Sequence, residues 1–193
     1  MIVGPRMQRR TIEMRFVNSA VLLGSLIVAG GLAGCASMMR ETPSIPVTSD
    51  SATVTFMRPS VFFGDGVDVY IWDENHFVGV VAAGTYVQYQ VAPGQHLFLG
   101  NAENWTYASG QLEAGHQYFL KVNLFPGILY GRAALGVFEP SDPRPTKWLG
   151  ELKPMAVIPE KRQAYEAEHK AHAEEATQDF KSGKVSAFAH IGQ

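Results

Sequence analysis

Residues 52–138 contain a series of short β-prone segments separated by turn residues, and this series limits the fold more than any other feature of the sequence. In one segment Val69 and Ile71 fall on one face while Tyr70 and Trp72 fall on the other, as the alternation of a strand requires. Strands at this spacing predict an all-β fold, a small antiparallel β-sandwich of about seven to eight strands. The expected strands cover 52–57, 67–72, 76–81, 86–91, 96–99, 105–112, 116–125 and 129–138.

A basic leader and an apolar segment precede this β-rich part. The apolar segment runs from Val21 to Leu32, which is shorter than the roughly 20 residues that a membrane-spanning helix needs. The order of the two predicts a secretory signal peptide rather than a permanent transmembrane anchor. Met1, Met7 and Met14 are all possible start sites, and each leaves the apolar segment intact. The basic residues of the leader are Arg6, Arg9, Arg10 and Arg15.

The apolar segment ends in Leu32-Ala33-Gly34-Cys35, which resembles the lipobox of bacterial lipoproteins. The resemblance implies cleavage before Cys35 and lipidation of its thiol. Each buried methylene contributes about 0.8 kcal/mol, so two or three acyl chains would hold the protein at a membrane. The next residue is Ala36 rather than aspartate, which by the sorting rule for Gram-negative lipoproteins favours the outer membrane, facing the periplasm. A buried cysteine beside an ordinary signal-peptidase site is the alternative.

Cleavage before Cys35 would leave 159 of the 193 residues, enough for one domain with a hydrophobic core. The mature chain would keep 12 of the 16 basic and 17 of the 18 acidic side chains, a formal charge of −5. An acidic chain without a basic cluster argues against nucleic acid as a partner. Because Cys35 is the only cysteine, the mature domain has no disulfide and must be held by packing.

Composition changes along the chain predict its organisation. Residues 36–51 are polar, with two prolines and no periodicity, and are expected to form a flexible tether. Residues 139–159 hold five prolines around Trp148, which we expect to be buried on the sandwich. The predicted parts are a signal peptide (1–34), the lipidated cysteine and tether (35–51), the β-sandwich (52–138), a proline-rich strap (139–159), a C-terminal α-helix (160–183) and a tail (184–193).

The expected helix is rich in alanine, glutamate and lysine, begins after Pro159 and ends at Gly183. Its apolar stripe is thin and looks too weak for a core face. The helix is therefore expected either to lie solvated against the domain or to serve as a handle for a partner protein. The stripe consists of Tyr165, His169, His172, Ala176 and Phe180.

Several short motifs in residues 52–125 resemble those of one bacterial family. They are similar to the lipoproteins classed as domain of unknown function 2846 and, more loosely, to PEGA-type β-sandwich modules. The resemblance implies a small β-sandwich on a lipid tether with no established enzymatic role, and it does not extend to the C-terminal part. The motifs are Met57-Arg58-Pro59-Ser60, Gly79 in a hairpin, Gly84-Thr85-Tyr86, the Pro93–His96 turn and Ala114–Phe119.

Exposed aromatic residues form the candidate ligand face. If Val69 and Ile71 point inward, Tyr70 and Trp72 point outward, and Trp105 and Tyr107 are expected beside them. Flat aromatic platforms bind glycans or proteins. The alternative is that the Trp148 segment or the C-terminal helix covers this face.

Metal-binding patterns are weak. His169 and His172, flanked by Glu166 and Glu168, have a spacing that suits a metal ion, but polar helix surface is the simpler interpretation. The acidic turn Gly64–Asp68 lacks the alternating ligands and closing glutamate of a calcium loop. We therefore expect no metal and no cofactor.

Catalytic patterns are weak too, and we expect no enzyme. His76, His96 and His116 each stand beside a turn, and they would form a shared site only if those turns converge. Hydrolysis by Asp68, Asp73 or His76 is the remaining catalytic alternative, without a nucleophile motif to accompany it.

The sequence thus predicts a lipid-anchored envelope protein that binds or scaffolds another envelope protein, with the C-terminal helix as the expected contact. The alternative function is glycan or peptidoglycan binding through the aromatic face.

Overall fold

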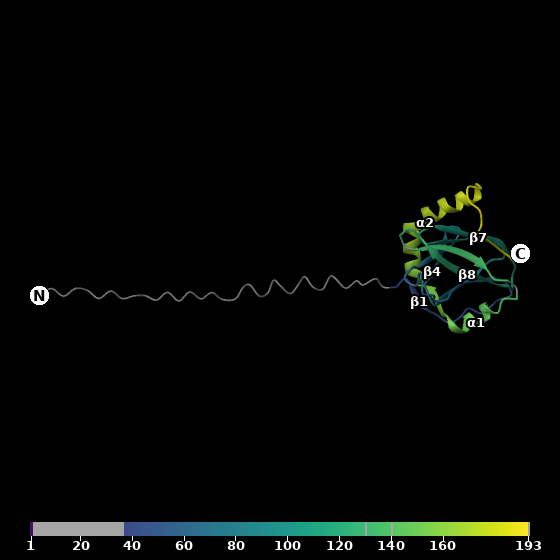
Figure 1. Cartoon of the computed structure of the whole chain (residues 1–193), viewed down its shortest axis with the longest axis horizontal. Coiled ribbons are helices and arrows are strands. Elements are labelled where there is room, and N and C mark those ends of the chain that lie inside the picture. The colour runs from purple at the N-terminus through teal and green to yellow at the C-terminus, as the bar shows by residue number, and fades with distance from the viewer. Residues whose placement is uncertain (2–36, 130, 140, 193) are drawn as a thin grey trace. The chain divides into compact units, whose positions relative to one another are not determined.

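The computed structural model describes Met1 and residues 37–129, 131–139 and 141–192. The chain divides into two units, Met1–Ala36 and Ser37–Gln193, and the fold below is that of the second unit. Its described residues form eleven strands and two helices, so the domain is mostly β (Figure 1). None of the helices in these ranges has the length and apolar character needed to cross a membrane.

The strands form two sheets. The six-stranded sheet has the order β1-β10-β5-β2-β8-β9, and the five-stranded sheet has the order β11-β7-β6-β3-β4. The elements are β1 (Met39–Glu41), β2 (Ala52–Arg58), β3 (Val69–Asp73), β4 (His76–Val81), β5 (Thr85–Val91), β6 (Gly94–Asn101), β7 (Trp105–Leu112), β8 (Gln117–Pro126), β9 (Gly131–Val137), α1 (Arg144–Glu151), β10 (Lys153–Val157), α2 (Pro159–Lys181) and β11 (Ala189–Ile191).

The eight strands expected between residues 52 and 138 are confirmed as β2 to β9. The hairpin of β3 and β4 is antiparallel, and its turn brings Asp73 opposite His76. Glu74 in this turn has a φ of 49°, the left-handed conformation that tight turns use. The C-terminal helix is confirmed as α2.

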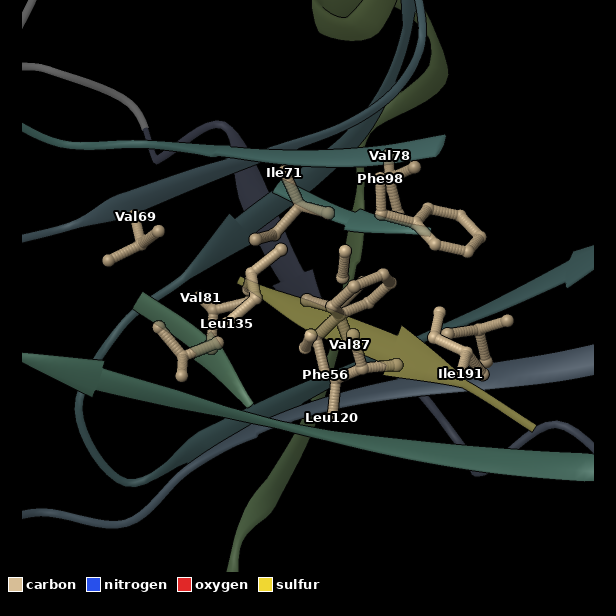
Figure 2. Close-up of a cluster of buried hydrophobic side chains, with 14 of the residues drawn as sticks. Phe56, Val69, Ile71, Val78, Val81, Val87, Phe98, Leu120, Leu135 and Ile191 are labelled. Carbon is tan, nitrogen blue, oxygen red and sulfur yellow. The ribbon is translucent and has the colours of Figure 1, made fainter. Parts of the chain in front are cut away.

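One hydrophobic core is built from side chains of both sheets. Phe56 of β2 meets Phe98 of β6 edge to face, with ring centroids 5.3 Å apart. Figure 2 shows these rings among Ile71, Leu120 and Leu135, all of them fully buried. Burying each such side chain contributes about 1.5–3 kcal/mol, so packing can hold the domain without a disulfide.

The expectation of a purely antiparallel arrangement is wrong. Strand β2 pairs in parallel with β8, β10 pairs in parallel with β5, and β11 pairs in parallel with β7. Parallel neighbours need long connections, and here the chain leaves one sheet and builds strands of the other before it returns.

The flexible tether expected over residues 35–51 is corrected for its described part. Strand β1 pairs with β10, with Met39 opposite Val157. Further along, the backbone N–H of Ile45 donates to Gln88 Oε1 at 2.8 Å, and Gln90 Nε2 donates to the carbonyl of Pro46 at 2.9 Å. The edge of a sheet offers unpaired backbone groups, and this segment uses them.

The proline-rich strap and the tail also contain regular structure. The strap holds α1 and β10, and Trp148 is half-buried with its ring 5.5 Å from that of Phe138, so the expectation of a buried tryptophan is met only in part. The tail, for which the sequence predicts nothing, forms β11 at the edge of the five-stranded sheet.

Candidate functional site

The predicted lipidation motif, Leu32, Ala33, Gly34 and Cys35, lies outside the described residues, as do residues 2–31 of the signal peptide and Ala36. The folded unit begins at Ser37, two residues after Cys35. Lipidation therefore stays a prediction, and the functional surfaces considered below belong to the folded unit.

Helix α2 covers the candidate aromatic face on the five-stranded sheet. Trp72 is 1% exposed and Tyr107 is 7% exposed. The ring of Tyr165 lies 5.3 Å from that of Tyr70, and the ring of Phe180 lies 5.7 Å from that of Tyr107. Of the two alternatives left open by the sequence, the structure thus shows the covered face.

The thin stripe of α2 is therefore a packing face. Ala173 is fully buried, Ala176 is 4% exposed, and both belong to a second hydrophobic cluster with Trp72. Trp105 is half-buried at the edge of the same cluster. The packing face differs from the predicted stripe in that it includes Ala173, whereas His172 is exposed. Two alanines and two aromatic rings suffice because the strands beneath supply the larger side chains.

Burial under α2 changes the acidity of the tyrosines. It raises the pKa of Tyr70, Tyr107 and Tyr165, because a phenolate loses its hydration there. Burial and the neighbouring Asp73 raise the pKa of Tyr89 to about 12.

The carboxylate of Glu166 fastens α2 to β4. Its Oε1 accepts the backbone N–H of Phe77 at 2.7 Å and lies 2.8 Å from His76 Nδ1. Glu166 thus faces the sheet and not a metal site with His169 and His172. Within the described ranges, no group of three or more potential metal ligands gathers.

The three strand-edge histidines have separate carboxylate partners. His96 lies 3.0 Å from Asp73, His76 pairs with Glu166, and His116 lies 3.7 Å from Glu113. The second ring nitrogen of His96 is 2.9 Å from the carbonyl of Ala92. Both nitrogens of His96 therefore have partners within the fold.

In the acidic turn before β3, Asp65 stabilises the loop to which it belongs. The carboxylate of Asp65 accepts the hydroxyl of Ser60 and, at 3.0 Å, the backbone N–H of Val61. These hydrogen bonds lower the pKa of Asp65, because they stabilise its ionised form.

The least expected surface feature is an apolar end made by two loops. The β2–β3 loop and the β8–β9 hairpin expose six large hydrophobic side chains, and Phe62, Ile128 and Leu129 are 108%, 93% and 78% exposed. The loops are neighbours, because a Cβ placed on Gly64 would come within 2.6 Å of Leu124 Cδ1. We call this surface the apolar end. It consists of Val61, Phe62, Phe63, Phe125, Ile128 and Leu129.

A buried arginine holds the first of these loops. Arg58 is 2% exposed, and its guanidinium donates to the carbonyls of Gly64 and Val67 and, at 3.2 Å, to that of Val81. Desolvation lowers the pKa of Arg58, while Asp68 and Asp65 act in the opposite direction. The loop that carries Phe62 is thus anchored to a buried guanidinium through the carbonyls of Gly64 and Val67.

A glutamate holds the second loop. Glu103 Oε1 accepts the backbone N–H of Ile128 at 2.7 Å and that of Leu129 at 3.3 Å. The backbone N–H of Glu103 donates to the carbonyl of Gly131 at 3.2 Å. A Cβ on Gly127 would displace the Glu103 carboxylate from its present position. Both loops are therefore fixed in conformations that expose their apolar side chains.

Two hollows flank the apolar end. A groove of about 590 Å³ is lined by Trp105, Tyr107, Phe125, Arg132 and Phe188, among others. A pocket of about 320 Å³ next to the β2–β3 loop is lined in part by Asp68, Tyr70, Asn101 and Glu103. The apolar end thus borders both an apolar groove and a pocket with acidic residues in its lining.

The sequence contains a weak signal for this surface. Phe62-Phe63 and Ile128-Leu129 are adjacent apolar pairs that stand next to glycines, where turns are normally polar. Pairs of this kind inside turns point to exposed hydrophobic residues.

No protein-family model matches the chain, and comparisons with curated proteins and with solved structures find no match. The family resemblance therefore stays a prediction from the motifs alone.

Proposed function

We propose that the chain is the precursor of a lipid-anchored envelope protein whose mature domain, a β-sandwich, is a non-enzymatic binding or scaffolding module for another envelope protein. The observation that carries the binding role is the apolar end, whose two loops are held by hydrogen bonds from Arg58 and to Glu103 while their apolar side chains stay exposed. Large exposed apolar patches on a folded domain mark sites of association.

The start of the folded unit supports the lipid anchor. Ser37 opens this unit two residues after Cys35, so the expected cleavage point falls at its boundary. The residues Ala36 and Ser37 favour the outer membrane, with the domain facing the periplasm.

The binding surface proposed now differs from the one expected from the sequence. The apolar face of α2 is occupied by the five-stranded sheet, so it is not available as a handle. The same packing occupies the aromatic face that glycan or peptidoglycan binding would use.

Two experiments test the proposal. Cys35→Ala should leave the domain folded but release it from the membrane fraction, and a variant that still partitions with membranes would contradict the anchor. A photo-crosslinking residue at Ile128 should capture one discrete envelope protein in intact cells, whereas the same residue at the exposed Glu168 of α2 should not. Absence of any captured protein at Ile128 would contradict the binding role.

A further inference from the structure

We infer that the apolar end points away from the bilayer that holds the anchor and docks a different protein, one whose apolar contact residues are flanked by a lysine or arginine. The inference rests on the proposed lipidation of Cys35. It adds the orientation of the domain and the chemistry of the partner.

The point where the chain enters the fold sets the position of the membrane. Consecutive Cα atoms are 3.80 Å apart, so the Cα of Cys35 must lie within about 8 Å of that of Ser37. Ser37 is held in place, because its carbonyl accepts Lys161 Nζ at 3.1 Å. β1 begins at Met39, at the side of the domain where the described chain starts (Figure 1). A lipid on Cys35 therefore places the bilayer next to Ser37 and the first turns of α2.

The apolar end lies at the opposite corner of the six-stranded sheet. β1 and β9 are its two outer strands, and five strand spacings of about 4.8 Å separate them by about 24 Å. Met39 is paired with Val157, and the register of the neighbouring strands shows that Pro126 lies at a different level along the sheet. The levels of Met39 and Pro126 differ by about eight residues, which is about 26 Å at about 3.3 Å per residue.

The offset across the strands and the offset along them combine to a separation of about 35 Å between Met39 and Pro126. A folded domain of this length has a radius of gyration of about 15 Å and so a width of about 39 Å. The entry point and the apolar end are therefore almost as far apart as the domain allows. A bilayer that meets the domain edge-on at Ser37 therefore does not reach Ile128.

The same geometry argues against a second copy as the partner. Copies anchored in one membrane would hold their apolar ends in the same direction. Pairing these ends head to head would turn one anchor away from its bilayer. The occupant that fits is a different protein reaching the domain from the far side.

Charge next to the apolar end specifies this partner further. The pocket beside the β2–β3 loop is lined by the carboxylates of Asp68 and Glu103. Asp68 is exposed, and its charge acts on both Arg58 and Tyr70. Carboxylates at the rim of an apolar contact favour a basic side chain on the partner.

Orientation can be measured with lipid-borne quenchers. Because lipidation uses the only cysteine, Glu160→Cys and Ile128→Cys each give one labelling site in the full, lipidated protein reconstituted into phospholipid vesicles. Glu160 is exposed in the first turn of α2. A fluorophore at position 160 should be quenched by nitroxide-labelled lipid, and one at position 128 should not. Quenching at position 128 would overturn the inference while leaving Cys35 lipidation intact.

Partner chemistry can be measured by charge reversal. Asp68→Lys should lower the capture yield at Ile128 in intact cells by about tenfold, because it opposes a basic partner residue. Glu139→Lys, at an exposed position after β9, is the matched control and should leave the yield unchanged. Unchanged capture in Asp68→Lys, or a crosslinked pair of two copies of this chain, would overturn the inference even where the proposed binding role holds.

Discussion

At the scale of single residues, Arg58 is the side chain that the apolar end depends on most. Arg58→Met would leave three carbonyls without their donor, and we expect the free energy of unfolding to fall by about 2–4 kcal/mol. Urea unfolding of the purified domain measures this change.

A second arginine provides the control for this prediction. Arg144 is exposed and pairs with Asp142, so Arg144→Met should lower the free energy of unfolding far less than Arg58→Met. Equal losses of unfolding free energy in the two variants would show that the burial of Arg58 does not contribute to stability.

Four tyrosines with raised pKa values, one buried and three half-buried, predict an alkaline loss of stability. Tyr70, Tyr89, Tyr107 and Tyr165 have raised pKa values in the folded domain, and that of Tyr89 is raised to about 12. An unfolded tyrosine titrates near about 10, so the unfolded chain loses its protons first. Stability is therefore fully present below pH about 10 and is lost as the pH rises through the folded pKa values.

The urea midpoint should accordingly fall from pH about 9 to about 11, and it should fall less in Tyr165→Phe than in the unmodified domain. An identical pH dependence in both proteins would mean that α2 does not bury this phenol.

At the scale of elements, the attachment of α2 depends on small residues. Ala173 is fully buried against the outer face of the five-stranded sheet. Ala173→Glu would press a carboxylate into this layer, and we expect a loss of about 2–4 kcal/mol or release of the helix. The maximum of tryptophan fluorescence emission should shift to longer wavelength as Trp72 becomes exposed to water.

Ala171 lies on the exposed side of the same helix and provides the matched control. Ala171→Glu should change stability by less than about 0.5 kcal/mol. If both variants behave alike, the helix is not held by its alanine face.

Elements differ in how far the sequence predicts them. The alternation of Val69 to Trp72 predicts the two faces of β3 correctly, because the pattern lies within the strand itself. Strands β1 and β11 have three residues each and no period of their own, and they exist because β10 and β7 offer them hydrogen bonds. The sequence of such a strand carries no signal that could be found without knowing its neighbour.

At the scale of the whole molecule, the folded domain should bind apolar molecules through its apolar end. The mature chain carrying Cys35→Ala should bind a hydrophobic dye in its native state. Phe62→Ser combined with Ile128→Ser should remove most of this fluorescence while the unfolding midpoint stays the same. Val47→Ser is the control, because Val47 is 45% exposed but lies outside the apolar end. Dye binding that survives the double substitution would argue against the apolar end as the exposed surface.

The candidate site was harder to predict than the fold for a physical reason. Turn residues are exposed by default, so Phe62 and Ile128 look like ordinary members of loops. What distinguishes them is that Arg58 and Glu103 fix the loops through hydrogen bonds, and Glu103 reaches across 25 residues of sequence to Ile128. Long-range bonds of this kind leave no local pattern.

The pairing of β1 with β10 also has a consequence for the order of assembly. Among the described strands β1 has β10 as its single neighbour, and more than a hundred residues separate the two in the chain. Contacts between such distant segments form late, because closing a long loop costs entropy before it is repaid. Under the proposed lipidation of Cys35, residues 37–51 would therefore begin as a flexible segment and would be drawn against the domain once β10 has formed. Completion of the fold would then be the event that sets the height of the domain above its membrane.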